Sequence, residues 1–209
     1  CARSPGAPRG ANREATVTLA RSIGPALLSL VAALTSSACG TSSAVEAGPP
    51  PCDQACQDNG AARAVRETMK LVYNLTLQGK PVGRQDATVD CPNGGRARVY
   101  GEATSNADQG TTAVTLTYEL AACAYTQRDD DVDETYAMTL SGTLTQVGVL
   151  AVQPGSSTAL VMRSPALTLA GTVHEPAIAY RGESCVVAFT QNGNRLTGTV
   201  CGRPVGLDL

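Results

Sequence analysis

The sequence has 209 residues and a formal net charge of −2, and it contains six Tyr, one Phe and no Trp. Twelve of its 16 Lys and Arg residues and 17 of its 18 Asp and Glu residues follow Cys39, so the chain beyond that point carries 12 − 17 = −5. An acidic chain without a basic stripe argues against a nucleic-acid partner. The shortage of aromatic side chains argues against stacking sites for sugars or bases.

The N-terminal segment contains basic residues, then an apolar run, then small residues. Arg9, Arg13 and Arg21 precede an apolar run over 23–34, and small residues then lead to Cys39. A helix of that length spans about 18 Å, which is too short for a hydrocarbon core of about 30 Å. The order predicts a removable export signal rather than a membrane-spanning helix.

The residues Ser36-Ser37-Ala38-Cys39 resemble the end of a bacterial lipoprotein signal peptide. The resemblance implies that the Cys39 thiol receives a diacylglyceryl group, that the new amino terminus is acylated, for example with palmitate, and that this lipid holds the chain on a membrane. Gly40 stands where that family often has Asp for inner-membrane retention, which implies the outer membrane, facing the periplasm or the cell surface. Secretion without lipidation is the alternative.

We therefore divide the chain into three parts. Residues 1–38 are a leader and signal peptide, whose first 20 residues are upstream translated sequence or a truncated leader. Residues 39–59 are the lipidated Cys and a tether rich in Pro, Gly and Ser. Residues 60–209 are expected to form a helix followed by an antiparallel β-domain.

A single helix is expected at the start of the folded part. One apolar face is formed by residues at i, i+4, i+7 and i+8, namely Val65, Met69, Val72 and Tyr73. This pattern predicts a helix over about 60–72, capped by Asp58 or Asn59 and stopped near Gly79. Apolar residues alternate over 71–77, which leaves open that the helix passes into a strand there.

From residue 84 onward the chain has the pattern of antiparallel strands. Alternate residues are apolar over 112–120, 136–140 and 167–173. A weak repeat relates 137–144 to 166–173, and its glycine recurs at Gly101, Gly142, Gly171 and Gly198. A strand glycine lets a sheet bend or approach another backbone closely. The predicted fold class is mainly β: an antiparallel curved sheet, sandwich or open barrel with one N-terminal helix.

Six cysteines follow Cys39, and an even number in an exported chain predicts three disulfides. They are Cys52, Cys56, Cys91, Cys123, Cys185 and Cys201. The rival interpretation is a thiolate metal site, but the chain lacks a C-x₂-C pair and an oxidising compartment opposes free thiolates. We therefore predict no metal held by these cysteines.

The C-terminal cysteines are predicted to join two strands of one hairpin. A three-residue loop over 192–194 places Val186 opposite Val200 and Cys185 opposite Cys201. Closing this loop is expected to stabilise the fold by about 3 kcal/mol.

A second hairpin, turning around Asn106, is predicted to bring Cys91 near Cys123. Its apolar residues match best when Val99 lies opposite Val114, and a single bulge reconciles this register with the cysteine pair. The remaining pair, Cys52 and Cys56, forms either a local bridge or one exchanged with these.

Candidate catalytic residues are few. His174 is the sole histidine and Glu175 follows it, but the sequence contains neither a G-x-S-x-G elbow nor an S-x-x-K motif. A lone histidine at a strand end is more often a surface residue than a catalytic base. We predict that the chain is not an enzyme and that it uses no cofactor.

An acidic segment carries the one candidate cation site. Asp129, Asp131 and Asp133 have the i, i+2, i+4 spacing of the first ligands in a calcium loop. Glu134 stands where that loop needs Gly, so a solvated acidic hairpin loop is the preferred interpretation and a weak calcium site the alternative.

The sequence alone thus favours a cell-envelope lipoprotein that acts as a non-enzymatic structural or interaction module. The alternative is a carrier that binds an apolar ligand in the concave face of a curved sheet, and a hydrolase is a distant third. An open cavity of some hundreds of Å³ would favour the carrier, whereas a filled interior would favour the structural module. The identity of the protein or apolar ligand partner does not follow from these residues.

Overall fold

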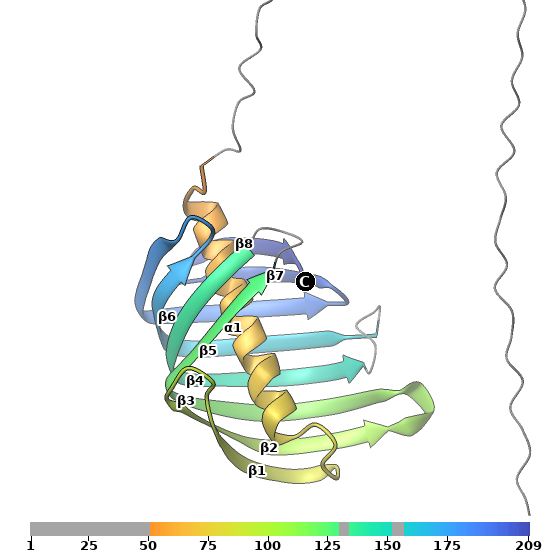
Figure 1. Ribbon diagram of the computed structural model, residues 1–209. Coiled ribbons are helices and arrows are strands. Elements are labelled where there is room, and N and C mark those ends of the chain that lie inside the picture. Colours follow the sequence, from red (N-terminus) through yellow and green to blue (C-terminus); the bar gives the residue numbers. More distant parts are fainter. Residues whose placement is uncertain (1–50, 130–133, 152–156) are drawn as a thin grey trace, which may run out of the picture. The chain divides into compact units, whose positions relative to one another are not determined.

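The computed structural model of the protein describes residues 51–129, 134–151 and 157–209. Within these ranges the chain forms one α-helix, one 3₁₀ turn and eight strands (Figure 1). The elements are α1 (Gln54–Thr76), β1 (Gly83–Asp90), β2 (Arg96–Asn106), η1 (Ala107–Gln109), β3 (Thr111–Asp129), β4 (Glu134–Ala151), β5 (Ala159–Val173), β6 (Ile178–Asn192), β7 (Arg195–Val200) and β8 (Arg203–Asp208). The predicted mainly β class is confirmed.

The eight strands form one antiparallel sheet in the order β1 to β8, so each strand pairs with its neighbours in sequence. The edge strands β1 and β8 do not pair with each other, and the sheet is open rather than closed. The described residues form no second sheet to make a sandwich. Among the predicted alternatives, the curved open sheet with one helix is therefore the one observed.

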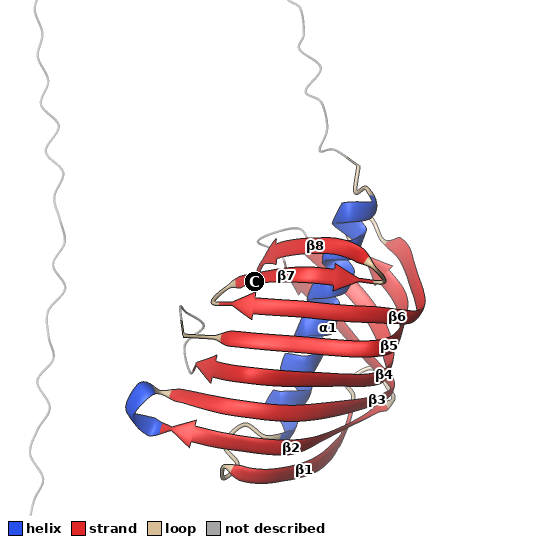
Figure 2. Cartoon of the chain, turned by 180° about the vertical axis from the view of Figure 1, so that it is seen from behind, coloured by secondary structure: helices blue, strands red, loops and turns tan. Residues whose placement is uncertain are grey.

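Helix α1 lies across the concave face of the sheet (Figure 1), and the view from behind shows the strands in front of it (Figure 2). Its N-terminal half is buried on several sides, where it carries small residues such as Ala61, Ala62 and Ala64. Small side chains let the surrounding strands approach the helix closely. The apolar core fills the space between this helix and the concave face.

The long central strands bend along a line of irregularities, here called the crease. The register shifts between Leu120 and Cys123 in β3, between Gly142 and Thr145 in β4, and over 164–169 in β5. Such bulges sharpen the local twist and bend the strand. Beyond the crease, the far ends of β3 to β6 fold over the N-terminal half of α1 (Figure 1).

The recurrent glycines lie opposite large buried side chains on the neighbouring strand. Gly101 pairs with Leu116, and Gly198 pairs with Phe189. Both glycines have φ near +140° (138° and 146°), and a Cβ there would lie 2.1 or 2.0 Å from a carbonyl oxygen of the adjacent strand. Only glycine tolerates this combination, so these positions let the sheet curve around the helix.

The predicted repeat has a structural counterpart in β4 and β5. The two copies, 137–144 and 166–173, lie side by side and antiparallel. Equivalent positions pair reciprocally, since Gly142 faces Leu167 and Gly171 faces Met138. The repeat is therefore a pair of strands related by a local pseudo-twofold axis.

The helix starts earlier than predicted. Its N-cap is Asp53, whose carboxylate accepts a hydrogen bond of 2.9 Å from the Cys56 N–H. Residues 54–59, which we assigned to the tether, form the first turns of α1. The expected caps, Asp58 and Asn59, lie inside the helix and make tertiary contacts instead.

The alternative strand over 71–77 is wrong, because α1 continues to Thr76. Val72 and Thr76 are buried one turn apart, and the Thr76 hydroxyl donates to the Val72 carbonyl. Leu75, which the alternation placed on a buried strand face, is 51% exposed. Tertiary packing of one helical face thus prevails over a short alternating pattern. Gly79 follows in a turn with φ of 75°.

The C-terminal hairpin has a shorter loop than predicted. Asn192 pairs with Arg195, so the loop holds two residues instead of three, and Val187 rather than Val186 faces Val200. The predicted register is therefore wrong by one residue. The Cys185–Cys201 bridge nevertheless forms, because Cys201 lies just beyond the ladder with φ of 51°.

The register predicted between β2 and β3 is also wrong. Val99 faces Tyr118 instead of Val114, because η1 and Gly110 make the turn longer. The bulge lies between β3 and β4. Cys91 follows β1 rather than sitting within β2, and from there it bridges Cys123 at the crease.

The described residues contain three disulfides, Cys52–Cys56, Cys91–Cys123 and Cys185–Cys201, as the cysteine pattern predicts. Three disulfides in one domain indicate an oxidising, exported location. In the described part of the chain, no helix has the length and apolar character needed to cross a membrane.

Candidate functional site

A cavity of about 440 Å³ lies between the C-terminal half of α1 and the central strands. The helix contributes residues at i, i+3, i+4 and i+7, which share one face: Arg66, Met69, Lys70 and Tyr73. The sheet contributes side chains from β4, β5 and β6: Gln146, Leu150, Leu160, Met162 and Gln191. This volume falls within the range of about 300–1,000 Å³ that is usual for small-molecule sites.

The inner wall of this α1 cavity is apolar. Met69, Leu160 and Met162 are each no more than 2% exposed. Thioether side chains adapt to irregular apolar ligands because they are unbranched and polarizable. The wall therefore suits a flexible hydrocarbon better than a rigid polar group.

Two cations and one carboxylate lie at the helix side of the cavity. The Arg66 guanidinium donates to the Gln191 side-chain oxygen at 3.2 Å and to Glu67 at 2.9 Å. Lys70 Nζ lies 3.4 Å from the other Glu67 oxygen, and its side chain is 54% exposed. Among the described residues, Glu67 is the one carboxylate paired with these two cations, so this turn of α1 carries a net charge of +1 (two cations minus one carboxylate).

A polar group also lies on the sheet side. The Gln146 side-chain oxygen accepts a hydrogen bond of 2.6 Å from the Tyr118 hydroxyl. Burial raises the pKa of Tyr118, so the phenol stays protonated and keeps donating. Among the described residues, Gln146 Nε2 has no hydrogen-bond acceptor. This nitrogen keeps some solvent-accessible surface, so it is not a fully buried unpaired donor. This amide is available to a ligand in the cavity.

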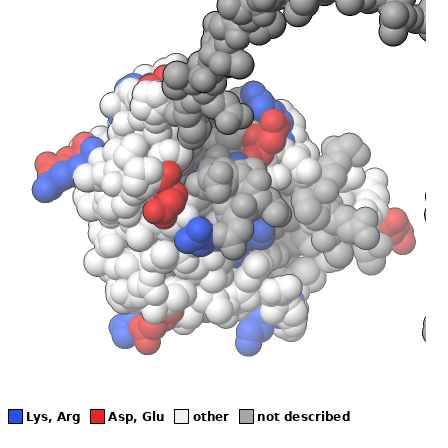
Figure 3. Space-filling model, turned by 45° about the horizontal axis from the view of Figure 1, so that its top comes forward, with Lys and Arg blue, Asp and Glu red and all other residues white. Residues whose placement is uncertain are grey.

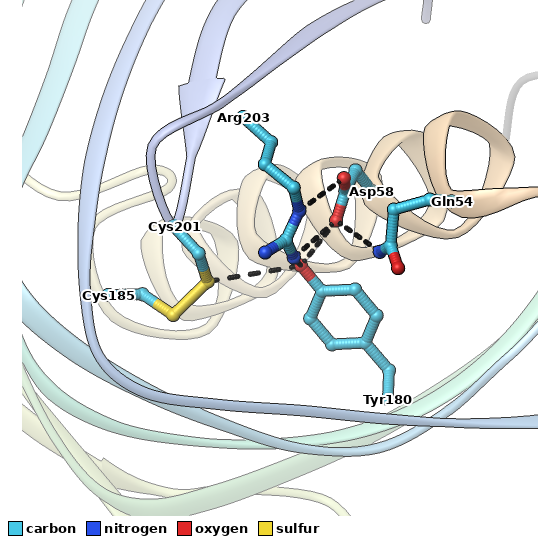
Figure 4. Close-up of a disulfide and its surroundings, with 6 residues drawn as sticks. All are labelled: Gln54, Asp58, Tyr180, Cys185, Cys201 and Arg203. Atoms are coloured by element: carbon cyan, nitrogen blue, oxygen red, sulfur yellow. Dashed lines mark hydrogen bonds and ion pairs between the residues drawn. A yellow bond between two sulfur atoms is a disulfide. The ribbon is translucent and has the colours of Figure 1, made fainter.

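A second cluster of polar residues, here called the Asp58 cluster, lies at the other end of α1 (Figure 4). Asp58 is 2% exposed and accepts four hydrogen bonds: one from Gln54, one from Tyr180 and two from Arg203. Burial alone would raise the pKa of Asp58, but these hydrogen bonds outweigh it and hold the pKa below 3.8.

The Asp58 cluster joins segments that are far apart in sequence. Tyr180 lies in β6 beyond the crease, and Arg203 begins β8, next to the Cys185–Cys201 bridge (Figure 4). Three of these donors contact Oδ1 of Asp58 and the Arg203 Nε–H contacts Oδ2, so both carboxylate oxygens are engaged by protein donors. We interpret the cluster as a structural connection between α1 and the C-terminal strands.

His174 lies in the turn between β5 and β6, with φ of 70°. One of its ring nitrogens and the sulfurs of Cys52 and Cys56 all lie within 4.8 Å of one another. Within the described ranges, His174 makes no hydrogen bond to a serine or a carboxylate. The expectation that the chain is not an enzyme stays a prediction.

The remaining predicted sites lie partly outside the described residues. Cys39, Asp131 and Asp133 are not described. Asp129 ends β3 and pairs with Glu134 at the start of β4, so the acidic segment connects these two strands. The cation alternative stays untested.

Charged side chains on the face shown in Figure 3 lie mostly as neighbouring groups of opposite sign, with uncharged surface between them. Several exposed ion pairs have this form, among them Arg98–Asp86 and Arg195–Asp208. On the described part of this face there is therefore no extended basic stripe.

Comparison with protein families, curated proteins and solved structures finds no match for this chain.

The sequence predictions did not find the α1 cavity. Arg66 and Lys70 are visible as a cationic pair at i, i+4, but such pairs are common on exposed helix faces. Gln146 and Gln191 are the better signal in retrospect, because each occupies an inward position of an otherwise apolar strand.

Proposed function

We propose that this chain is an exported carrier that binds a single-chain amphiphile with an acidic head group in the α1 cavity. The observation that carries this proposal is the cavity itself, which stays open although α1 fills the rest of the concave face. The apolar wall supports a hydrocarbon tail, and the excess positive charge beside Lys70 supports an anionic head.

In this proposal the tail lies against the half-buried lining residues Tyr73 and Leu150, where burying apolar surface contributes about 25 cal/mol per Å². The acidic head lies toward Lys70, with the free amide of Gln146 as a further donor. The exposed ammonium contributes less than the tail, because solvent screens its charge.

Laurate, a saturated fatty acid, is the probe that tests this proposal by isothermal titration calorimetry. We expect saturable binding of one laurate per chain. Leu150→Trp should abolish it, because the half-buried Leu150 lines the cavity and an indole there fills the space. Lys70→Gln should weaken binding by about threefold to fivefold through loss of the head-group charge.

Lys80→Gln is the matched control, since Lys80 is exposed and lies outside the cavity lining. It removes the same charge and should leave laurate affinity unchanged. Absence of laurate binding, or equal binding by the folded Leu150→Trp variant, would contradict the carrier. Either result would favour the structural or interaction module, which the filled N-terminal half of the concave face supports.

We further propose that the carrier is held on the outer membrane by lipid on Cys39. The basic, apolar and small order of residues 9–38 supports this, as does the Cys that follows. Intact-mass measurement of protein extracted from the cell envelope should give the chain from Cys39 onward, with diacylglyceryl and acyl additions. A mass that lacks these additions, or that places cleavage elsewhere, would contradict the anchor.

A further inference from the structure

The structure brings the sole histidine of the chain to its N-terminal disulfide. Cys52 directly precedes the N-cap of α1, and Cys56 lies in the first helical turn. The β5–β6 turn beyond the crease carries His174 to the same place. The end of β5 packs closely on the helix at this point, because Gly60 has no side chain. A Cβ on Gly60 would lie only 3.1 Å from the Cβ of Val173, the residue before His174.

The resulting group has the composition of a metal site. Two sulfurs and one imidazole nitrogen lie within 4.8 Å of one another. Thiolate and imidazole are the preferred ligands of zinc, which binds sulfur at about 2.3 Å and nitrogen at about 2.0–2.1 Å. While the sulfurs are bonded to each other they cannot both bind a metal, so the site exists only in the reduced chain.

The Cys52–Cys56 bridge is also the one of the three described disulfides most open to reduction. Both of its cysteines are partly exposed, whereas Cys91 and Cys123 are buried, as is Cys185 in the third bridge. It closes a sequence separation of 4, against 32 and 16 for the others. A short loop gains the least from the restriction of the unfolded chain. Accessibility and loop length therefore both favour its selective opening.

We propose that Cys52, Cys56 and His174 form a redox-gated site for one Zn²⁺ ion. A dithiol reductant supplies two electrons and two protons, becomes a disulfide itself and leaves Cys52 and Cys56 as thiols. Zinc then displaces the two thiol protons to solvent and takes the lone pair of neutral His174. Two thiolates balance the 2+ charge, and the fourth tetrahedral position stays open to water or another ligand. Reoxidation by a disulfide-forming oxidant releases the ion.

Cobalt(II) is the probe, because thiolate-bound cobalt absorbs by charge transfer in the near ultraviolet. The purified protein is treated with a mild phosphine reductant, and peptide mapping establishes which thiols are free. We expect one cobalt per chain, with the thiolate band, only after reduction, and competition by zinc. The oxidised protein should show no band.

Two variants separate this site from adventitious binding. Cys52→Ser with Cys56→Ser should remove the thiolate band after the same reduction. His174→Asn keeps a residue that tolerates the positive φ at this position and should weaken cobalt binding by at least about tenfold. Circular dichroism checks that both variants are folded. No thiolate band in the reduced protein, or equal affinity in folded His174→Asn, would overturn the proposal.

Discussion

Gly198→Ala is expected to destabilise the domain by at least about 3 kcal/mol, which is a large part of the roughly 5–15 kcal/mol that holds a domain together. A Cβ at this position would lie 2.0 Å from the Ala188 carbonyl oxygen and 2.9 Å from the Phe189 Cα. Both atoms belong to the backbone of β6, so no side-chain rotation relieves the overlap. Urea unfolding followed by circular dichroism measures the loss.

Gly202→Ala is the matched control in the turn that follows β7. Gly202 also has positive φ, 78°, but a Cβ there meets nothing within 4 Å. The control therefore carries only the conformational cost of a left-handed residue, about 1 kcal/mol. Similar losses in the two variants would show that β6 and β7 separate easily, and the glycine would then not be needed for sheet curvature.

Local patterns in the sequence predicted the helix, several of the strands and two of the disulfide pairs. Alternation predicted strands over 112–120, 136–140 and 167–173, and the even cysteine count with hairpin turns predicted the pairs Cys185–Cys201 and Cys91–Cys123. The registers could not be derived in the same way. A Gly-Asn pair within a run of turn residues does not determine whether the loop holds two or three residues. A change of one residue in loop length shifts every cross-strand pair.

The Asp58 cluster and the group formed by Cys52, Cys56 and His174 could not be predicted for a different reason. Asp58 meets Tyr180 and Arg203 across 122 and 145 residues of sequence, and His174 meets Cys52 only because the strands fold at the crease. The local sequence predicted Asp58 as a helix cap, but Asp53 is the N-cap of α1. Contacts of this kind depend on how far a sheet bends, and bulges set that angle.

Asp58→Asn is expected to lower the free energy of unfolding by about 2–3 kcal/mol near neutral pH. The substitution removes the charge that pairs with Arg203 and turns an acceptor oxygen into a donor amide facing the Arg203 and Tyr180 donors. Arg203 can recover some hydration because its side chain is 43% exposed, which keeps the loss below that of a fully enclosed pair. Urea unfolding measures the difference.

The pH dependence identifies the carboxylate behind this loss. The folded-state pKa of Asp58 lies below its ordinary value of 3.8, so the contribution is complete above pH 3.8 and is lost as the pH falls through the folded-state pKa. The difference between wild type and Asp58→Asn should therefore shrink in that acidic range. Asp86→Asn is the control, since Asp86 pairs with Arg98 on the exposed surface, where solvent screens the charges, and its loss should cost much less stability than Asp58→Asn. A difference that stays constant down to pH 2 would mean that Asp58 acts through packing rather than through its charge.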